Sequence, residues 1–326
     1  MGKLKNKVAL ITGSTKSIGL EIAKLFHMKG ATVIMTGRAP KEKGLEIAKA
    51  IGITDYISLD VSSEANWHDV AQYVAVKYKR LDILVNNAGI DKVANTDRLQ
   101  DLEHCTLEDW QAVHAVNLDG TFLGCKTMMP LLIKSEHASI INMGSRSGLV
   151  GVPSYPAYSS SKAALLNFTK TVAMHCTSHN YPVRCNIIVP AAILTDIWDL
   201  EFGRGELRQQ RIEEYARNIP LKRMGQADEV AKLAVFLACD DSLFITGAQY
   251  IIDGGTMAGT GSYNTNNENK ALNNTNSKDD DSLIKQEQQD FRSQQVKNYN
   301  LKQNFFASTS ALNNQLKEDI RFNIAP

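Results

Sequence analysis

Seven short apolar runs, most of them separated by segments with helical spacing, constrain the fold of this chain more than any other feature of its sequence. The runs are continuous rather than alternating in hydrophobicity, which is typical of parallel strands buried on both faces. The predicted strands are Val8–Ile11, Thr32–Met35, Tyr56–Leu59, Ile83–Val85, Ile140–Met143, Cys185–Val189 and Tyr250–Ile252. Helical spacing between them is found in Ile18–Met28, Trp67–Tyr78, Trp110–Ile133, Tyr158–Ser178 and Ala227–Cys239. The sequence therefore predicts a single α/β domain: a doubly wound, mostly parallel seven-stranded sheet with helices on both faces.

The composition of the chain changes after about Gly259. Residues 260–326 are rich in Asn, Gln, Lys and Asp and poor in aliphatic side chains. We predict a dinucleotide-binding catalytic domain over residues 1–259 and a disordered, Asn/Gln-rich low-complexity tail over residues 260–326, because the tail offers too little apolar surface to offset the entropy of ordering. The alternative is that Leu283–Leu316, where apolar residues are spaced, folds as a weak helix against a neighbouring subunit, the pocket mouth or another protein.

Charge and cysteine content exclude several classes of partner. Lys and Arg total 36 and Asp and Glu 35, so the net charge of +1 gives no reason to expect nucleic acid. Five cysteines without a C-x-x-C spacing favour reduced thiols and a cytoplasmic location. No apolar stretch reaches the ~18 residues of a membrane span, and the first strand begins too early to leave room for a signal peptide. We expect neither a membrane nor a metal partner.

A glycine-containing turn joins the first predicted strand to the first predicted helix. It runs from Thr12 to Gly19 and includes Gly13. Such a turn lets the backbone approach a pyrophosphate, and the helix N-terminus offers N–H groups and a favourable dipole to the anion. Glycine-rich segments often only make turns, but this position in the chain favours a dinucleotide site.

Tyr158 and Lys162 lie four residues apart, on one face of a predicted helix. A tyrosine is a poor base at its ordinary pKa of ~10, and a nearby ammonium favours the phenolate. Ser145 can then hold a substrate oxygen in line. Taken alone, a Tyr-x-x-x-Lys pair is more often an ordinary pair on a helix surface.

Taken together, these elements resemble the classical short-chain dehydrogenase/reductase family from about Lys7 to Gly259. A single such motif has a high false-positive risk, whereas the order and spacing of the whole set are specific. The resemblance implies a Rossmann fold and an NAD(P)-dependent oxidoreductase acting on CH–OH groups. It is carried by Thr12-Gly13 and Gly19, Asp60-Val61, Asn86-Asn87-Ala88-Gly89, Asn117, Ser145, Tyr158 and Lys162, Pro190 and Thr195, and Asp253-Gly254-Gly255.

The resemblance also implies the catalytic roles. Hydride passes between the substrate carbinol carbon and the nicotinamide, and the protein supplies position and proton handling. Tyr158 is the expected general acid and base, and Ser145 polarises the substrate oxygen. Lys162 is expected to lower the tyrosine pKa and to hold the nicotinamide ribose. Asn117 is expected to bind a water that links Lys162 to solvent.

Most of the remaining matched residues are expected to contact the cofactor. The first turn should surround the phosphates and the adenosine ribose, Asp60 and Val61 should meet adenine, and Asn87 to Gly89 should lie beneath the cofactor. The alternatives for Asn87 and Asp60 are turn formation and helix capping. The full predicted set is Gly13, Thr15, Ser17, Ile18, Gly19, Arg38, Asp60, Val61, Asn87, Ala88, Gly89, Tyr158, Lys162, Pro190, Ile193 and Thr195.

Three positions depart from the family pattern. Ser17 stands where the family usually has the central glycine of the turn, Gly144 replaces a frequent serine, and Ala191 replaces a frequent glycine. We expect one of two effects of Ser17: its Cβ crowds the pyrophosphate of the cofactor, or its hydroxyl donates a hydrogen bond to that pyrophosphate. These departures concern cofactor affinity rather than the chemistry.

The end of the second predicted strand bears on the choice of cofactor. Relatives that prefer NAD usually carry an acidic residue there, which accepts from the ribose 2′-hydroxyl. Here that position is Gly37, and Arg38 follows it, suited to a 2′-phosphate. We therefore favour NADP(H). NAD(H) is the alternative, with Arg38 as a solvated loop residue.

The substrate pocket is expected to be lined by Asp91–Thr96, Arg146–Pro153 and Ala192–Phe202. The apolar residues of the last segment suit a hydrophobic or steroid-like secondary alcohol or ketone. An equally supported interpretation is that Trp198 and Phe202 only pack within a lid over the cofactor. An alternative function is a catalytically weak cofactor-binding module that presents its tail to a partner.

The family resemblance further implies a homo-oligomer, either a tetramer or a dimer. Trp110–Ile133 and Tyr158–Ser178 carry more apolar residues than one buried face requires. We expect these two segments to pack against their copies.

Overall fold

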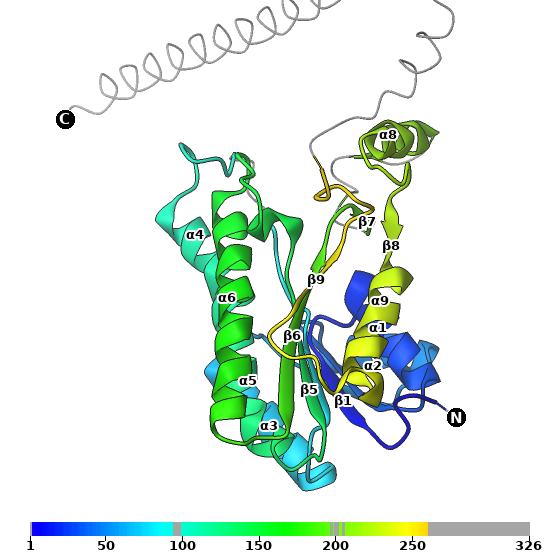
Figure 1. Ribbon diagram of the computed structural model, residues 1–326, viewed down its shortest axis with the longest axis vertical. Helices are drawn as coiled ribbons and strands as arrows, with labels where there is room; N and C mark the ends of the chain where they lie inside the picture. Colours follow the sequence, from blue (N-terminus) through cyan, green and yellow to red (C-terminus); the bar gives the residue numbers. More distant parts are fainter. Residues whose placement is uncertain (1, 94–98, 196–197, 199–201, 204–205, 260–326) are drawn as a thin grey trace, which may run out of the picture. The chain divides into compact units, whose positions relative to one another are not determined.

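In the computed structural model, which describes residues 2–93, 99–195, 198, 202–203 and 206–259, the chain forms the predicted seven-stranded sheet (Figure 1). The strand order is β3-β2-β1-β4-β5-β6-β9, and every pairing of neighbours in it is parallel. All seven predicted strands are confirmed. Their bounds are β1 Val8–Ile11, β2 Thr32–Gly37, β3 Asp55–Ser58, β4 Ile83–Asn86, β5 Ala138–Met143, β6 Val183–Pro190 and β9 Gln249–Ile252; β7 Ile193–Leu194 and β8 Gly225–Gln226 pair separately.

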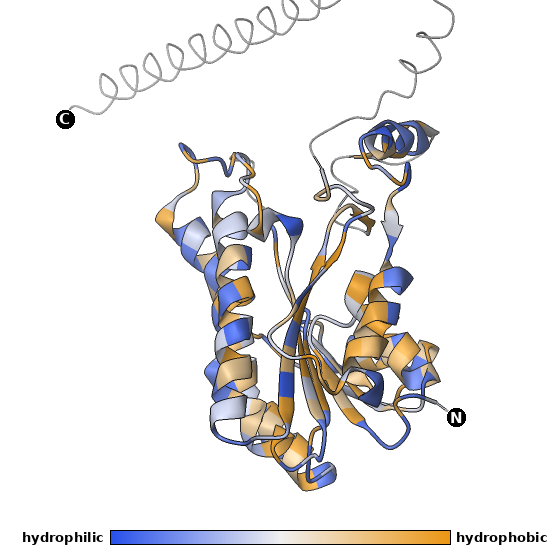
Figure 2. Cartoon of the chain, in the orientation of Figure 1, coloured by the Kyte–Doolittle hydropathy of each residue, from blue (hydrophilic) through white to orange (hydrophobic). Residues whose placement is uncertain are grey.

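Helices cover both faces of this sheet, as predicted (Figure 1). One face carries α1 (Ser17–Met28), α2 (Lys41–Ala50) and α9 (Ala227–Ala238). The other carries α3 (Glu64–Lys77), α5 (Gly120–Leu132) and α6 (Pro156–Ser178). Figure 2 shows apolar residues concentrated along the strands and on the helices beside them. This doubly wound arrangement brings the carboxyl ends of the strands to one edge, where ligands bind in such folds.

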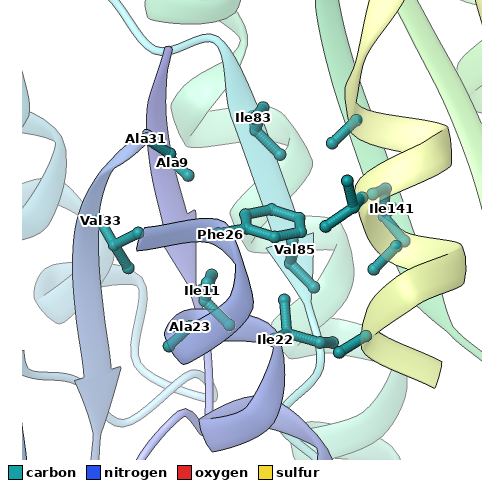
Figure 3. Close-up of a cluster of buried hydrophobic side chains, with 14 of the residues drawn as sticks. Ala9, Ile11, Ile22, Ala23, Phe26, Ala31, Val33, Ile83, Val85 and Ile141 are labelled. Carbon is teal, nitrogen blue, oxygen red and sulfur yellow. The ribbon is translucent and has the colours of Figure 1, made fainter. Parts of the chain in front are cut away.

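The core between α1 and the sheet is closely packed (Figure 3). Phe26 of α1 is fully buried and lies over β1 and β4, near Ile83 and Val85. Burying such a side chain stabilises a fold by roughly 1.5–3 kcal/mol. The first helix is thereby fixed, and so is the turn that leads into it.

The prediction of one regular helix over Trp110–Ile133 is wrong. It consists of α4 (Leu107–His114), a π-helical turn η1 (Ala115–Asp119) and α5. The π turn contains Asn117, whose side chain is fully buried. Such turns inside α-helices are frequent at functional sites.

In the part of the chain that the structure describes, two α-helices fall outside the predicted segments. They are α2 and α8 (Glu206–Arg217), and both are polar over most of their length. No helix among the described residues is long and apolar enough to cross a membrane. The predicted tail, residues 260–326, lies outside the described residues.

Candidate active site

The four predicted catalytic side chains come from three different parts of the chain. Asn117 lies in the π turn, Ser145 follows β5 and caps the short 3₁₀ helix η2 (Arg146–Gly148), and Tyr158 and Lys162 lie in the first turns of α6. The parallel sheet places the ends of β4, β5 and β6 next to one another. The structure therefore brings these residues to one edge of the sheet.

Asn117 ties the loop after β4 to α6. Its amide group makes two hydrogen bonds with Ile90: Oδ1 accepts from the Ile90 N–H and Nδ2 donates to the Ile90 carbonyl, each at 2.9 Å. Nδ2 also donates to Ser161 Oγ at 3.0 Å, and the Ser161 hydroxyl donates to the Tyr158 carbonyl at 2.8 Å. Asn117 thus fixes the backbone on both sides of the site. This role for Ser161 was not predicted, since a serine within a polar run carries no distinguishing signal.

Lys162 is almost completely buried, with 4% of its surface exposed. Its Nζ donates to the Met143 carbonyl at 2.8 Å and lies 5.7 Å from the centroid of the Tyr158 ring. Burial lowers the pKa of Lys162 to about 8, so the ammonium is still largely charged at neutral pH. A Cβ on Gly89 would lie 3.4 Å from Lys162 Nζ and 3.2 Å from Asn117 Oδ1, which shows how closely these groups approach.

The pKa of Tyr158 differs in direction from the sequence prediction. Burial raises it above its ordinary value, a hydrogen bond with Ser145 lowers it, and the Asp91 carboxylate raises it further. Lys162 Nζ lies over the Tyr158 ring, and the expected lowering of the Tyr158 pKa by this ammonium does not appear in the protein alone. Ser145 Oγ accepts from the Ser147 N–H at 3.2 Å and so caps η2.

The glycine-containing turn is held against the loop after β4. Asn87 Nδ2 donates to the carbonyls of Thr12 and Gly13 at 2.9 and 3.2 Å. The N–H groups of Asn87 and Ala88 both donate to Thr12 Oγ1, at 3.0 and 2.9 Å. Asn87 thus stabilises the turn, which was the alternative to a cofactor contact for this residue. Gly13 adopts a positive φ of 62°, and a Cβ on it would lie only 2.9 Å from the Cα of Ala88.

The start of α1 fits a phosphate. Its N-cap, Lys16, makes no side-chain cap, and its first turn contains no acidic residue. A helix N-terminus without a cap leaves N–H groups and a positive dipole for an anion. Ile18 and Gly19 lie in this first turn, and Ser17 opens it with a left-handed φ of 50°. The residues present therefore fit the pyrophosphate of a dinucleotide.

The residues expected at the adenosine end also gather together. A Cβ on Gly37 would lie 3.3 Å from the Thr15 side chain, and exposed Arg38 follows. The pKa of Asp60 is lowered mainly by a hydrogen bond from the Ser62 hydroxyl, with a smaller contribution from Arg38. Helix capping, the alternative for Asp60, is wrong: Ser63 caps α3 and accepts from the Asn66 N–H.

Two predicted cofactor contacts have side chains that point into the protein. Val61 is buried, and Ile193 is 6% exposed and packs so closely on Gly225 that a Cβ there would lie 2.6 Å from it. Contacts of these residues with a cofactor would therefore use the backbone. Pro190 ends β6 and Thr195 follows β7; Ala192 between them has a positive φ of 53°.

The three departures from the family pattern have distinct physical settings. Ser17 adopts a left-handed conformation that glycine favours. Ala191 has no positive φ, so no glycine is needed there. A Cβ on Gly144 would lie 3.0 Å from Ile187 Cδ1, so Ile187 fills the space that a serine would need.

The predicted pocket segments are only partly described, since residues 94–98, 196–197 and 199–201 lie outside the described residues. Trp198 and Phe202 stack with ring centroids 5.0 Å apart, and both contact Tyr215 of α8 edge-on. Trp198 Nε1 also donates to the Ile193 carbonyl at 2.8 Å. These contacts favour the packing interpretation of the two aromatic side chains.

Comparison with known proteins gives the same class. A family model described as enoyl-(acyl carrier protein) reductase matches residues 13–257. The chain is 38% identical over 260 residues to the NADP-dependent (R)-specific alcohol dehydrogenase of Lentilactobacillus kefiri, covering 78% of this chain and 98% of that one. It is 37% identical over 259 residues to the 3-oxoacyl-(acyl-carrier-protein) reductase of Thermotoga maritima, with 78% and 99% covered. With the D-threitol dehydrogenase of Mycolicibacterium smegmatis it shares 32% identity over 256 residues, with 78% and 94% covered.

Fold, site and relatives together define an NAD(P)-dependent oxidoreductase that acts on CH–OH groups. The chain belongs to the classical short-chain dehydrogenase/reductase family.

Proposed function

We propose that this enzyme interconverts a secondary alcohol and a ketone with NADP(H), using Tyr158 as its general acid and base. The observation that carries the proposal is the connection of four side chains. The Tyr158 hydroxyl is hydrogen-bonded with Ser145, and Lys162 lies over the Tyr158 ring. Asn117 is linked through Ser161 to the start of α6, the helix that contains both Tyr158 and Lys162. The bound nicotinamide supplies or accepts the hydride.

The chain's own groups handle the proton. In ketone reduction Tyr158 donates its proton to the carbonyl oxygen, and its raised pKa keeps the hydroxyl protonated for that step. Ser145 holds the same oxygen by a hydrogen bond. Lys162, largely charged at neutral pH, stabilises the phenolate that remains. We further propose that Asn117 binds a water that links Lys162 to solvent.

NADP(H) rather than NAD(H) is supported by the end of β2. Gly37 offers no carboxylate to a ribose 2′-hydroxyl, and Arg38 is exposed and therefore accessible to a 2′-phosphate. One relative is named an NADP-dependent alcohol dehydrogenase. The hydrophobic or steroid-like character of the substrate has weaker support, because Trp198 and Phe202 are occupied by each other and by Tyr215.

The test is turnover of aliphatic, cyclic and steroid secondary alcohols, and of the matching ketones, with both cofactors. We expect oxidation or reduction of at least one compound, faster with the phosphorylated cofactor. A folded protein that binds NADPH but converts no compound in either direction would be the cofactor-binding module considered above.

We also propose a homo-oligomer and a cytoplasmic location. Apolar side chains remain exposed on the segments expected to pair: Trp110 is 37%, Phe122 46% and Met174 66% exposed. All five cysteines are free thiols. A monomeric mass by light scattering at micromolar concentration would refute the oligomer.

Finally, we propose that the domain is complete by Gly259 and that the tail is dispensable. β9 closes the sheet before that residue. A chain cut after Gly259 should keep its melting temperature and its turnover. Loss of either, or a change from oligomer to monomer, would make the tail a structural part of the enzyme.

A further inference from the structure

The short connection between β2 and α2 bears the arginine proposed to choose the cofactor. Arg38 directly follows Gly37, the last residue of β2, and α2 begins at Lys41. The Arg38 side chain is exposed, whereas Gly37 is buried. An arginine on an exposed connection binds an anion more tightly when its backbone is already ordered, because less conformational freedom is lost on binding. The contacts that hold this connection therefore matter for what Arg38 can bind.

The hydroxyl of Tyr56, in the neighbouring strand β3, contacts the backbone on both sides of Arg38. It lies 2.8 Å from the Gly37 carbonyl oxygen and 2.7 Å from the Ala39 carbonyl oxygen. A tyrosine hydroxyl has one proton to donate. The Gly37 carbonyl also accepts from the Leu59 N–H at 2.9 Å, so it keeps a partner without this hydroxyl. The Tyr56 proton therefore matters most for the Ala39 carbonyl, which lies beyond the end of β2.

Packing fixes the position of the Tyr56 hydroxyl. Tyr56 is only 4% exposed, and it pairs with Met35 in the parallel register of β2 and β3. Gly44 of α2 lies so close to the ring that a Cβ on this glycine would overlap it. A buried ring held between a strand and a helix has little freedom to move. The hydroxyl is thus a rigid point to which the connection is attached.

This point lies next to the glycine-containing turn that is expected to hold the cofactor. A Cβ on Gly37 would lie 3.6 Å from the Tyr56 hydroxyl oxygen, and 3.3 and 3.4 Å from Cγ2 and Oγ1 of Thr15. Thr15 belongs to that turn, between β1 and α1. Gly37 is thus in close contact with both, and the backbone that Tyr56 fixes is the part of the connection nearest to the turn.

We propose that Tyr56 is a positioning residue for cofactor choice, which holds the backbone on both sides of Arg38 so that the guanidinium is placed for the 2′-phosphate of NADP(H). The proposal rests on the proposed function, because it concerns the role given there to Arg38. Tyr56 is buried and acts through Arg38. NADH has no 2′-phosphate, so its binding gains little from an ordered Arg38.

The test is fluorescence titration of NADPH and NADH with the full-length variant Tyr56→Phe, which keeps the packed ring and removes the hydroxyl. We expect the Kd of NADPH to rise by about threefold to tenfold, the effect of one neutral hydrogen bond, and the Kd of NADH by less than about twofold. At saturating NADPH, kcat should stay unchanged while the KM for NADPH rises.

Tyr73→Phe is the matched control. The Tyr73 hydroxyl donates to the carboxylate of Asp55 at 2.9 Å, and Asp55 directly precedes Tyr56 in β3. This variant therefore loses a hydroxyl bonded to the same strand but away from Arg38. Its Kd values for both cofactors should match those of the natural enzyme.

A double variant distinguishes positioning from a general structural role. If Tyr56 acts through Arg38, adding Tyr56→Phe to Arg38→Ala should change the Kd of NADPH by less than about twofold, because independent contributions would add and coupled ones do not. Ala39→Gly loosens the same segment without disturbing the core. It should also weaken NADPH binding more than NADH binding.

The outcomes separate this inference from the proposed function. If Arg38→Ala weakens NADPH selectively but Tyr56→Phe and Ala39→Gly affect the two cofactors equally or not at all, the positioning role is wrong and the proposed function stands. Additive effects of Tyr56→Phe and Arg38→Ala would overturn the inference in the same way. If Arg38→Ala itself weakens both cofactors equally, the preference for NADP(H) and the role of Tyr56 are both wrong.

Discussion

The catalytic groups and the pyrophosphate turn lie at the same edge of the sheet, yet they depend on different parts of the chain. At the catalytic groups the side chains act, and Asn117, Ser145, Tyr158 and Lys162 keep the residue types that proton transfer needs. At the turn the backbone N–H groups act, and Ser17 stands in place of a glycine at a φ of 50°. A binding site made of backbone groups tolerates a different side chain as long as the backbone can still adopt the required conformation. The cost is backbone strain when a residue other than glycine takes a positive φ.

The largest expected effect tests the side-chain half of this comparison. Tyr158→Phe removes the general acid and base, so turnover should fall by about 10²–10⁴-fold. NADPH binding and the melting temperature should stay as they are, because the ring and its packing remain. Tyr250→Phe, a tyrosine in β9, is the control and should keep full turnover. Ketone reduction at the natural rate by Tyr158→Phe would remove Tyr158 from the chemistry.

The second effect concerns a side chain at the cofactor end. Arg38→Ala should weaken NADPH binding by about tenfold to a hundredfold, since one charge-assisted hydrogen bond is lost, and should leave NADH binding almost unchanged. Fluorescence titration of both cofactors measures this difference. Exposed Arg217, in α8, provides the control substitution Arg217→Ala. Equal losses for the two cofactors would show that Arg38 only faces solvent.

The third effect tests the backbone half of the comparison. Ser17→Gly should raise the free energy of unfolding by about 0.5–1 kcal/mol, because relief of the left-handed strain exceeds the added entropy of the unfolded glycine. Urea denaturation without cofactor measures it.

Ser14→Gly in the same turn should have the opposite sign. Ser14 is buried, and its Oγ bonds both the N–H and the carbonyl of Thr36. If Ser17→Gly lowered stability instead, contacts of the Ser17 side chain would outweigh the strain of its backbone.

The smallest effect is a shift in pH dependence. Reduction needs protonated Tyr158, so kcat/KM for a ketone falls as pH rises through the pKa of that hydroxyl. Asp91 raises this pKa; Asp91→Asn removes the negative charge, lowers the pKa and moves the alkaline limb of the profile to lower pH. Glu103→Gln should leave the limb in place. A limb that moved to higher pH in Asp91→Asn would contradict the proximity of the two groups.

The strands were predictable because continuous apolar runs report burial on both faces directly. The helices α2 and α8 were not, since α2 buries only Gly44 and Ala48 and α8 is polar over most of its length, so neither shows an apolar stripe. The π turn was missed because one extra residue in a long helical segment hardly alters its apolar spacing. The catalytic positions followed from motif order. The role of Ser161 did not, because it is a polar residue of an ordinary kind whose partners are brought to it only by the fold. The direction of the Tyr158 pKa depends on burial, which spacing does not reveal.

The π turn also limits which insertions and deletions this segment of the chain can tolerate. An α-helix rotates by about 100° per residue, so the additional residue in Ala115–Asp119 sets the angle between the faces of α4 and α5. A deletion of one codon here would restore a regular helix, but it would rotate α4 relative to α5. Either the His114–Ser160 contact with α6 or the Asn117 contacts would then be lost. Insertions and deletions between Leu107 and Leu132 are therefore expected to be selected against even where single substitutions are tolerated, and homologues should keep this segment at constant length.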